Sequence, residues 1–171
     1  MKSVVFILII IQLAFTGCMN SGNKQSEDEF DEKVNKLVLS ENKKGEEYFF
    51  KVPSSKGILE YKVTYLGNIK TLQGDYLKFL NNVVFAGLYE DSKRASCTVN
   101  IYDTNNKKIG YYYVGGLIDA PQRVEGTNLV FNYNNDRCNQ TTSINFKDSI
   151  PHQIFISCTK EGGDLYTFSA Q

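Results

Sequence analysis

The hydrophobic and polar positions along the chain follow three successive patterns. An apolar run over 4–13, interrupted only by Gln12, gives way to small and polar residues. Apolar residues then recur at the spacing of one helix face: Phe30, Val34, Leu37 and Val38. From Glu47 onward apolar and polar residues alternate, as they do on half-buried β-strands. The three patterns predict a targeting segment, one helix and a β-rich domain.

The helical pattern has signals of a helix start and end. Ser26 and Glu29 match a capping box, and acidic residues occupy the following turn, where the helix dipole favours them. Basic residues and Gly45 follow the last apolar position, as is typical of a helix end. We predict an amphipathic helix over 27–40, preceded by a short polar tether over 18–26.

Segment 41–171 contains about ten strand candidates separated by turns rich in Gly, Asn, Asp and Pro. The candidates are residues 48–52, 59–65, 75–80, 83–89, 97–101, 108–114, 127–133, 143–146, 153–158 and 165–169. Short strands at this spacing are typical of an all-β sandwich or barrel. We predict a mainly β fold, with a single antiparallel β-sandwich (or barrel) domain of about 8–10 short strands after the helix.

The apolar run at the N-terminus is too short to cross a membrane. A spanning helix needs about 20 apolar residues, whereas a positive start, a shorter apolar run and small residues are typical of a secretory signal. The run ends in Phe15-Thr16-Gly17-Cys18. These four residues resemble the lipobox of bacterial lipoproteins, although Phe15 stands where Leu is commonest.

The lipobox resemblance implies an anchor. In such proteins the signal, here 1–17, is removed and the cysteine, here Cys18, carries a diacylglycerol and further acyl chains such as palmitate. Two or more acyl chains make anchoring stable. The resemblance therefore implies a lipid-anchored protein of the bacterial cell envelope, at the outer membrane on its periplasmic or surface side. The alternative is a plain cleaved signal, with Cys18 an ordinary cysteine of a secreted protein.

The acidic residues at 27–32 have two interpretations. In some lipoproteins of Gram-negative bacteria, acidic residues shortly after the lipidated cysteine direct export to the cell surface. Favourable interaction with the dipole of a capped helix explains the same residues without a receptor. Both interpretations stay open at this point.

Charge argues against one class of partner. The chain has 19 basic and 19 acidic residues. Removal of Lys2 with the signal leaves 18 basic residues against 19 acidic ones, a net charge of −1. Nucleic-acid binding needs a dense basic face, and the lysines here extend no further than pairs. We expect no nucleic-acid partner.

The cysteines allow one intrachain disulfide. If Cys18 carries the lipid, Cys97, Cys138 and Cys158 remain. An exported protein reaches an oxidising compartment, which favours a bridge. Strand alternation places Cys97 and Cys158 on core faces, and Cys138 lies in an Asn-rich loop. We expect a Cys138–Cys158 disulfide with Cys97 as a buried thiol; Cys97–Cys158 is the alternative.

Few residues suit catalysis. His152 is the only histidine, and it lies at the beginning of a predicted strand. The chain therefore has no paired His or Cys spacing for a metal and no serine or cysteine triad, and we expect no metal and no cofactor. A hydrolase with two carboxylates stays open as an alternative, and the best-placed acids for it are Glu60, Asp75, Glu90 and Asp119.

The tyrosines indicate binding. The chain has eleven Tyr, eleven Phe and no Trp. One predicted strand carries Tyr112 on the opposite face from Tyr111 and Tyr113, so one face shows tyrosine outward. We predict a surface formed by Tyr112, Asn134 and Asn135 that binds a glycan or protein partner, because rings stack on sugars and amides bond hydroxyls. The high strand propensity of tyrosine explains the same residues without a ligand.

Together these residues predict a lipid-anchored, non-catalytic binding or accessory module. The membrane is a partner through the lipid on Cys18, and a glycan or protein is the expected ligand. The alternatives are a lipid-anchored hydrolase with a carboxylate pair and a structural component of the envelope.

Overall fold

One helix and ten strands make up the described part of the chain. The structure is a computed structural model that describes residues 27–54, 57–87, 89, 92–116, 120–135 and 138–171. The predicted signal, lipobox and tether lie outside these residues. The elements are α1 (Glu27–Glu41), β1 (Glu47–Ser54), β2 (Gly57–Lys70), β3 (Tyr76–Ala86), β4 (Arg94–Tyr102), β5 (Lys108–Tyr113), β6 (Arg123–Glu125), β7 (Asn128–Asn135), β8 (Cys138–Asn145), β9 (Gln153–Ser157) and β10 (Gly163–Ala170).

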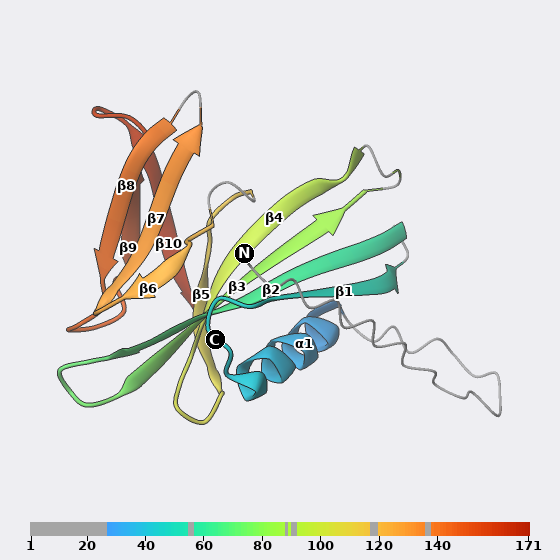
Figure 1. Cartoon of the computed structure of the whole chain (residues 1–171), viewed down its shortest axis with the longest axis horizontal. Coiled ribbons are helices and arrows are strands. Elements are labelled where there is room, and N and C mark those ends of the chain that lie inside the picture. Colours follow the sequence, from blue (N-terminus) through green and yellow to red (C-terminus); the bar gives the residue numbers. More distant parts are fainter. Residues whose placement is uncertain (1–26, 55–56, 88, 90–91, 117–119, 136–137) are drawn as a thin grey trace.

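The strands form two antiparallel sheets (Figure 1). The large sheet has seven strands in the order β1-β2-β3-β4-β5-β10-β9, and the small sheet has three in the order β6-β7-β8. The small sheet packs on one face of the large sheet, which we call the inner face, and α1 packs on the other, outer face. The prediction of a mainly β sandwich preceded by a helix is confirmed. The two sheets stay separate, so the sandwich and not the barrel is formed.

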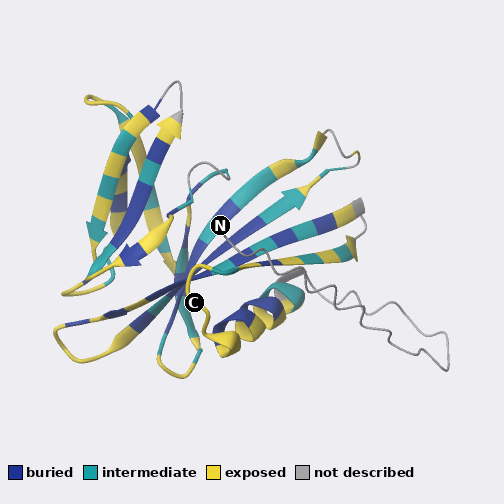
Figure 2. Ribbon diagram, in the orientation of Figure 1, coloured by how far each residue is buried: buried dark blue, intermediate teal, exposed yellow. Residues whose placement is uncertain are grey.

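Two hydrophobic cores lie on opposite faces of the large sheet. The larger core fills the space between the two sheets, and the smaller one lies between α1 and strands β1 to β4. Figure 2 shows the resulting alternation of buried and exposed positions along the strands. Val34 and Val38 on α1 pack in the smaller core, as the helical pattern predicted. Aromatic and branched side chains of both sheets form the larger core.

A bulge lets β2 contribute to both cores. Tyr65 pairs with Leu80 of β3, but the next paired residue of β2 is Gly67, so Leu66 is the extra residue. An extra residue reverses which face the following side chains occupy. Tyr65 therefore packs under α1, whereas Leu66 and Ile69 pack between the sheets. Gly67 has a φ of 123°, which side-chain-bearing residues rarely adopt.

Strand β3 is one long strand where the sequence predicted two. The predicted break fell at Asn81 and Asn82, since adjacent asparagines are typical of turns. Both are buried within the strand and hydrogen-bonded. Asn81 donates to the carbonyl oxygen of Pro121, and Asn82 donates to Asp31 and Asn35 of α1. Tertiary hydrogen bonds thus stabilise polar side chains that local sequence assigns to a turn.

The predicted disulfide between Cys138 and Cys158 is confirmed. Cys138 is the first residue of β8 and not a loop residue as predicted, and Cys158 directly follows β9. The bond therefore links the small sheet to the edge of the large sheet, where the backbone N–H of Ser157 also donates to Thr142 Oγ1 at 3.0 Å. Cys97 is fully buried between the sheets, as predicted.

Candidate functional site

The tyrosines of β5 lie on the opposite faces from those predicted. Tyr112 is fully buried between the sheets, where its hydroxyl donates to the carbonyl oxygen of Pro151. Its partners in register, Val99 of β4 and Phe168 of β10, also belong to the larger core. The prediction that Tyr112 points outward is wrong, because its place in the register puts it on the inner face. Tyr111 and Tyr113 are the outward tyrosines.

The predicted asparagines lie away from these tyrosines. Asn134 is exposed near the end of β7, at the hairpin that leads to β8. Asn135 pairs with Cys138 in the same hairpin, and its side chain is outside the described part of the structure. The hairpin belongs to the small sheet, which covers the inner face of the large sheet (Figure 1). Tyr111 and Tyr113 alternate with the inward Tyr112 and so lie on the outer face. The predicted surface of Tyr112, Asn134 and Asn135 is therefore not formed.

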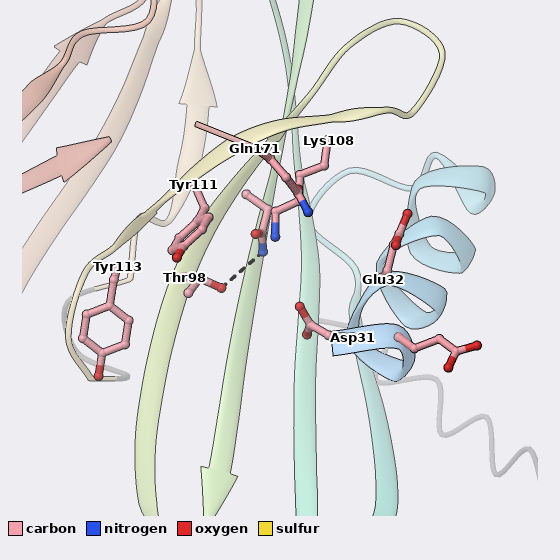
Figure 3. Close-up of a pocket in the computed structure, with 9 residues that line it drawn as sticks. Asp31, Glu32, Thr98, Lys108, Tyr111, Tyr113 and Gln171 are labelled. Atoms are coloured by element: carbon pink, nitrogen blue, oxygen red, sulfur yellow. Dashed lines mark hydrogen bonds between the residues drawn. The ribbon is translucent and has the colours of Figure 1, made fainter. Parts of the chain in front are cut away.

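A groove of about 650 Å³ lies on the outer face, between α1 and β5 (Figure 3). Acidic residues of α1 form one side and tyrosines of β5 the other, with polar residues of β4 between them. We call it the outer groove, and its lining residues are Glu29, Asp31, Glu32, Thr98, Asn100, Lys108, Tyr111, Tyr113 and Gln171. The outer groove thus lies on the strand that the sequence singled out, but on the opposite face from Tyr112.

The acids on the α1 side of the outer groove have partners within the protein. Glu32 forms an ion pair with Lys36 at 2.7 Å. The hydrogen bond from Lys36, together with the positive charges of Lys36 and Lys108, holds the pKa of Glu32 below its ordinary value. Asp31 accepts hydrogen bonds from Asn82 and, at 3.5 Å, from Asn35. Lys36 therefore balances the charge of Glu32, and neutral amides hold Asp31 in place as a hydrogen-bond acceptor.

The opposite side of the outer groove is aromatic, and the floor is polar. The Nζ of Lys108 lies 4.9 Å from the ring centroid of Tyr111. Tyr113 is 56% exposed, so its ring is open to solvent. On the floor, Asn100 is buried and its Nδ2 donates to Thr98 Oγ1 at 3.2 Å (Figure 3). Rings, hydroxyls, amides and carboxylates thus meet in one open site.

The structure separates the two hydrolase candidates that it describes. Glu60 pairs with Lys51 and, at 3.2 Å, with Lys93, and the hydrogen bond from Lys51 is the main cause of its lowered pKa. Glu60 lies near the start of β2, which continues for ten more residues to Lys70, and Asp75 is exposed in the turn that follows this strand. At about 3.3 Å per residue the two acids are about 30 Å apart. Paired carboxylates of glycosidases lie about 5–10 Å apart.

Glu90 and Asp119 lie outside the described residues. His152 is exposed just before β9. Within the described ranges, no three His, Cys, Asp or Glu residues gather as a metal site would require.

Among the residues that the structure describes, α1 has neither the length nor the apolar character of a membrane-crossing helix.

Comparison of the chain with protein-family models, with curated proteins and with solved structures yields no match.

Proposed function

We propose that the mature chain is a lipid-anchored, non-catalytic binding module of the bacterial cell envelope, which holds a glycan or protein partner in the outer groove. The observation that carries this proposal is the meeting of Tyr111 and Tyr113 with polar groups of α1 and β4 in one open site. Pockets that combine aromatic rings with a few hydrogen-bonding groups are typical of ligand sites.

The contacts of the acids support binding over catalysis. Asp31 is held by asparagine amides, and Glu32 is ion-paired with Lys36 and kept ionised at neutral pH. A general acid needs a raised pKa, whereas the pKa of Glu32 is lowered. The acids therefore suit acceptance of hydrogen bonds from a ligand.

The anchor is supported by the resemblance of Phe15-Thr16-Gly17-Cys18 to a lipobox. Cells that express the wild type and are grown with labelled palmitate are expected to yield labelled protein in the membrane fraction. Cys18→Ala is expected to lose both the label and the membrane association. A Cys18→Ala protein that still fractionates with membranes contradicts the anchor.

The binding role is tested with the mature chain and its Tyr113→Ala variant. Envelope polysaccharides and envelope proteins are passed over each immobilised chain, and the retained material is compared. We expect retention by the wild type and its loss in Tyr113→Ala. Tyr89→Ala is the matched control, because Tyr89 is 75% exposed in the loop between β3 and β4, outside the outer groove.

Two results would replace the proposal. Turnover of a polysaccharide that disappears in Glu32→Gln or Asp31→Asn supports the hydrolase. Retention that is equal in wild type and Tyr113→Ala, or absent in both, supports a structural component of the envelope.

A further inference from the structure

Three of the seven strands of the large sheet have no covering layer on their outer face among the described residues. Helix α1 packs on strands β1 to β4, and the outer faces of β5, β10 and β9 lie beyond it (Figure 1). Alternation places Tyr166 and Phe168 of β10 on the inner face, so Leu165 and Thr167 point outward. Exposed large side chains mark this surface: Tyr113 is 56%, Leu165 is 59% and Phe155 is 49% exposed.

The strand register connects these side chains to the outer groove. Tyr111 is paired with Ser169 of β10, and further along β10 Leu165 is paired with Phe155 of β9. Between these two rows lies Thr167, paired with Gln153. We call the outward side chains of β5, β10 and β9 the outer strip. It begins at the tyrosines of the outer groove and ends at Phe155.

We infer that the outer groove and the outer strip together bind an extended, uncharged glycan chain. This inference rests on the proposed function and narrows its partner to one class. A sugar ring has an apolar C–H face and a rim of hydroxyls, so it needs aromatic faces beside hydrogen-bonding groups. The outer strip alternates these two kinds of side chain from row to row.

The same alternation disfavours a partner helix. A helix docks through a continuous apolar stripe against an apolar groove. Here Thr167 and Ser169 separate Leu165 and Phe155 from Tyr111, so the apolar positions do not form one continuous surface. Burial of those hydroxyls under an apolar helix face would leave them without hydrogen-bond partners, which costs free energy.

The charges disfavour a cationic peptide. Such a partner has to compete with the lysines that already stand at the groove. Lys36 is ion-paired with Glu32, and Lys108 stands over the ring of Tyr111, where an incoming cation would have to stack. A neutral ligand rich in hydroxyls uses the same carboxylates and amides as acceptors and donors without competing against these lysines.

The dimensions of the surface set the length of the ligand. Tyr111 and Phe155 are separated by two strand spacings of about 4.8 Å and by four residues of about 3.3 Å along β10, which gives about 16 Å. This exceeds the size of a single sugar. We therefore expect affinity to rise with the number of sugar units until the chain reaches Phe155.

The test uses the mature chain (18–171) as cells process it, purified in detergent. Its probes are four sugar series, of glucose, xylose, mannose and N-acetylglucosamine. Each series contains the monosaccharide and the β-linked disaccharide and hexasaccharide. A lysine-rich peptide and an amphipathic helical peptide are tested in parallel. Dissociation constants are measured by calorimetry. We expect one sugar series to bind, and its hexasaccharide to bind at least about tenfold more tightly than its disaccharide.

Three variants locate the contacts. Tyr113→Ala is expected to weaken the hexasaccharide and the disaccharide about tenfold, whereas Tyr113→Phe retains most of the affinity because the ring remains. Phe155→Ala is expected to weaken only the hexasaccharide, since a disaccharide in the outer groove does not reach that residue. Tyr89→Ala is the control and leaves every constant unchanged.

The outcomes separate this inference from the proposed function. Binding of a peptide that Tyr113→Ala abolishes, with no sugar bound, overturns the glycan but keeps a binding module. Sugar binding that does not depend on chain length, or that Phe155→Ala leaves intact for the hexasaccharide, overturns the outer strip as part of the site. No binding of any probe overturns the inference, and retention of envelope protein then decides the proposed function.

Discussion

Substitution of Tyr112 by alanine tests which tyrosines of β5 face the core. The wild-type ring lies between the sheets, with its centroid 5.2 Å from that of Phe168 and 6.4 Å from that of Phe146. Its hydroxyl donates to the carbonyl oxygen of Pro151. Tyr112→Ala removes the ring contacts and the hydrogen bond together, in a region without solvent.

The expected loss of stability follows from these contacts. Truncation of a fully buried aromatic side chain to alanine costs about 3–5 kcal/mol. Tyr112→Phe keeps the ring and loses only the hydrogen bond, which costs about 1 kcal/mol. For a chain of this size each kcal/mol lowers the melting temperature by about 2–4 °C. We therefore expect a decrease of about 6–20 °C for Tyr112→Ala and about 2–4 °C for Tyr112→Phe.

Thermal and urea unfolding, followed by far-UV circular dichroism, measure this loss. Tyr113→Ala is the matched control, because it makes the same substitution at the next residue of the strand. Its side chain faces solvent, so we expect a change within about 0.5 kcal/mol. The assignment of faces is refuted if Tyr112→Ala unfolds with the wild-type midpoint, or if Tyr113→Ala is the more destabilising of the two.

Three further predictions concern the disulfide, the surface ion pair of Lys51 with Glu60, and a glycine. Replacement of both Cys138 and Cys158 by alanine opens a loop with a sequence separation of 20, and we expect a loss of about 3 kcal/mol in urea unfolding. Because Lys51 lowers the pKa of Glu60 below 4.5, the charged form stabilises the fold above that pH and the gain is lost as pH falls below it. Wild type should therefore lose more stability than Glu60→Gln between about pH 5 and pH 3 in pH-dependent unfolding, and equal losses would contradict the pairing. Gly110→Ala places a methyl carbon against the ring of Phe168 and the backbone oxygen of Ser169, and we expect a loss of stability of about 1–3 kcal/mol in melting experiments. A wild-type melting temperature would show that β10 lies further from β5.

Local patterns in the sequence were enough to predict the classes of element. The period of Phe30, Val34 and Val38 predicts α1, because a helix buries one stripe of side chains. The alternation along 59–65 and 97–101 predicts strands, because successive side chains of a strand point to opposite faces. These element classes depend on neighbours along the chain. For the disulfide the sequence narrowed the pairing to Cys138–Cys158 or Cys97–Cys158, and the fold decided between them.

The sequence could not decide which face of an alternating strand is buried. Tyr111, Tyr112 and Tyr113 are chemically identical, and alternation says only that the middle one opposes the other two. The choice came from pairing with Val99 of the preceding strand and with Phe168, which lies far along the chain; together they set the register of β5. A shift of one residue would have exchanged the faces.

By itself the sequence therefore determined the period of each segment and the class of fold, and it reduced the disulfide to two possible pairings. The tertiary structure alone decided that Asn81 and Asn82 continue a strand, since their hydrogen bonds reach Pro121 and α1. It also created the outer groove, because only the folded sheet places α1, which packs on β1 to β4, across from the tyrosines of β5. Long-range packing brings acids and tyrosines together that lie about 80 residues apart, and no local pattern contains that contact.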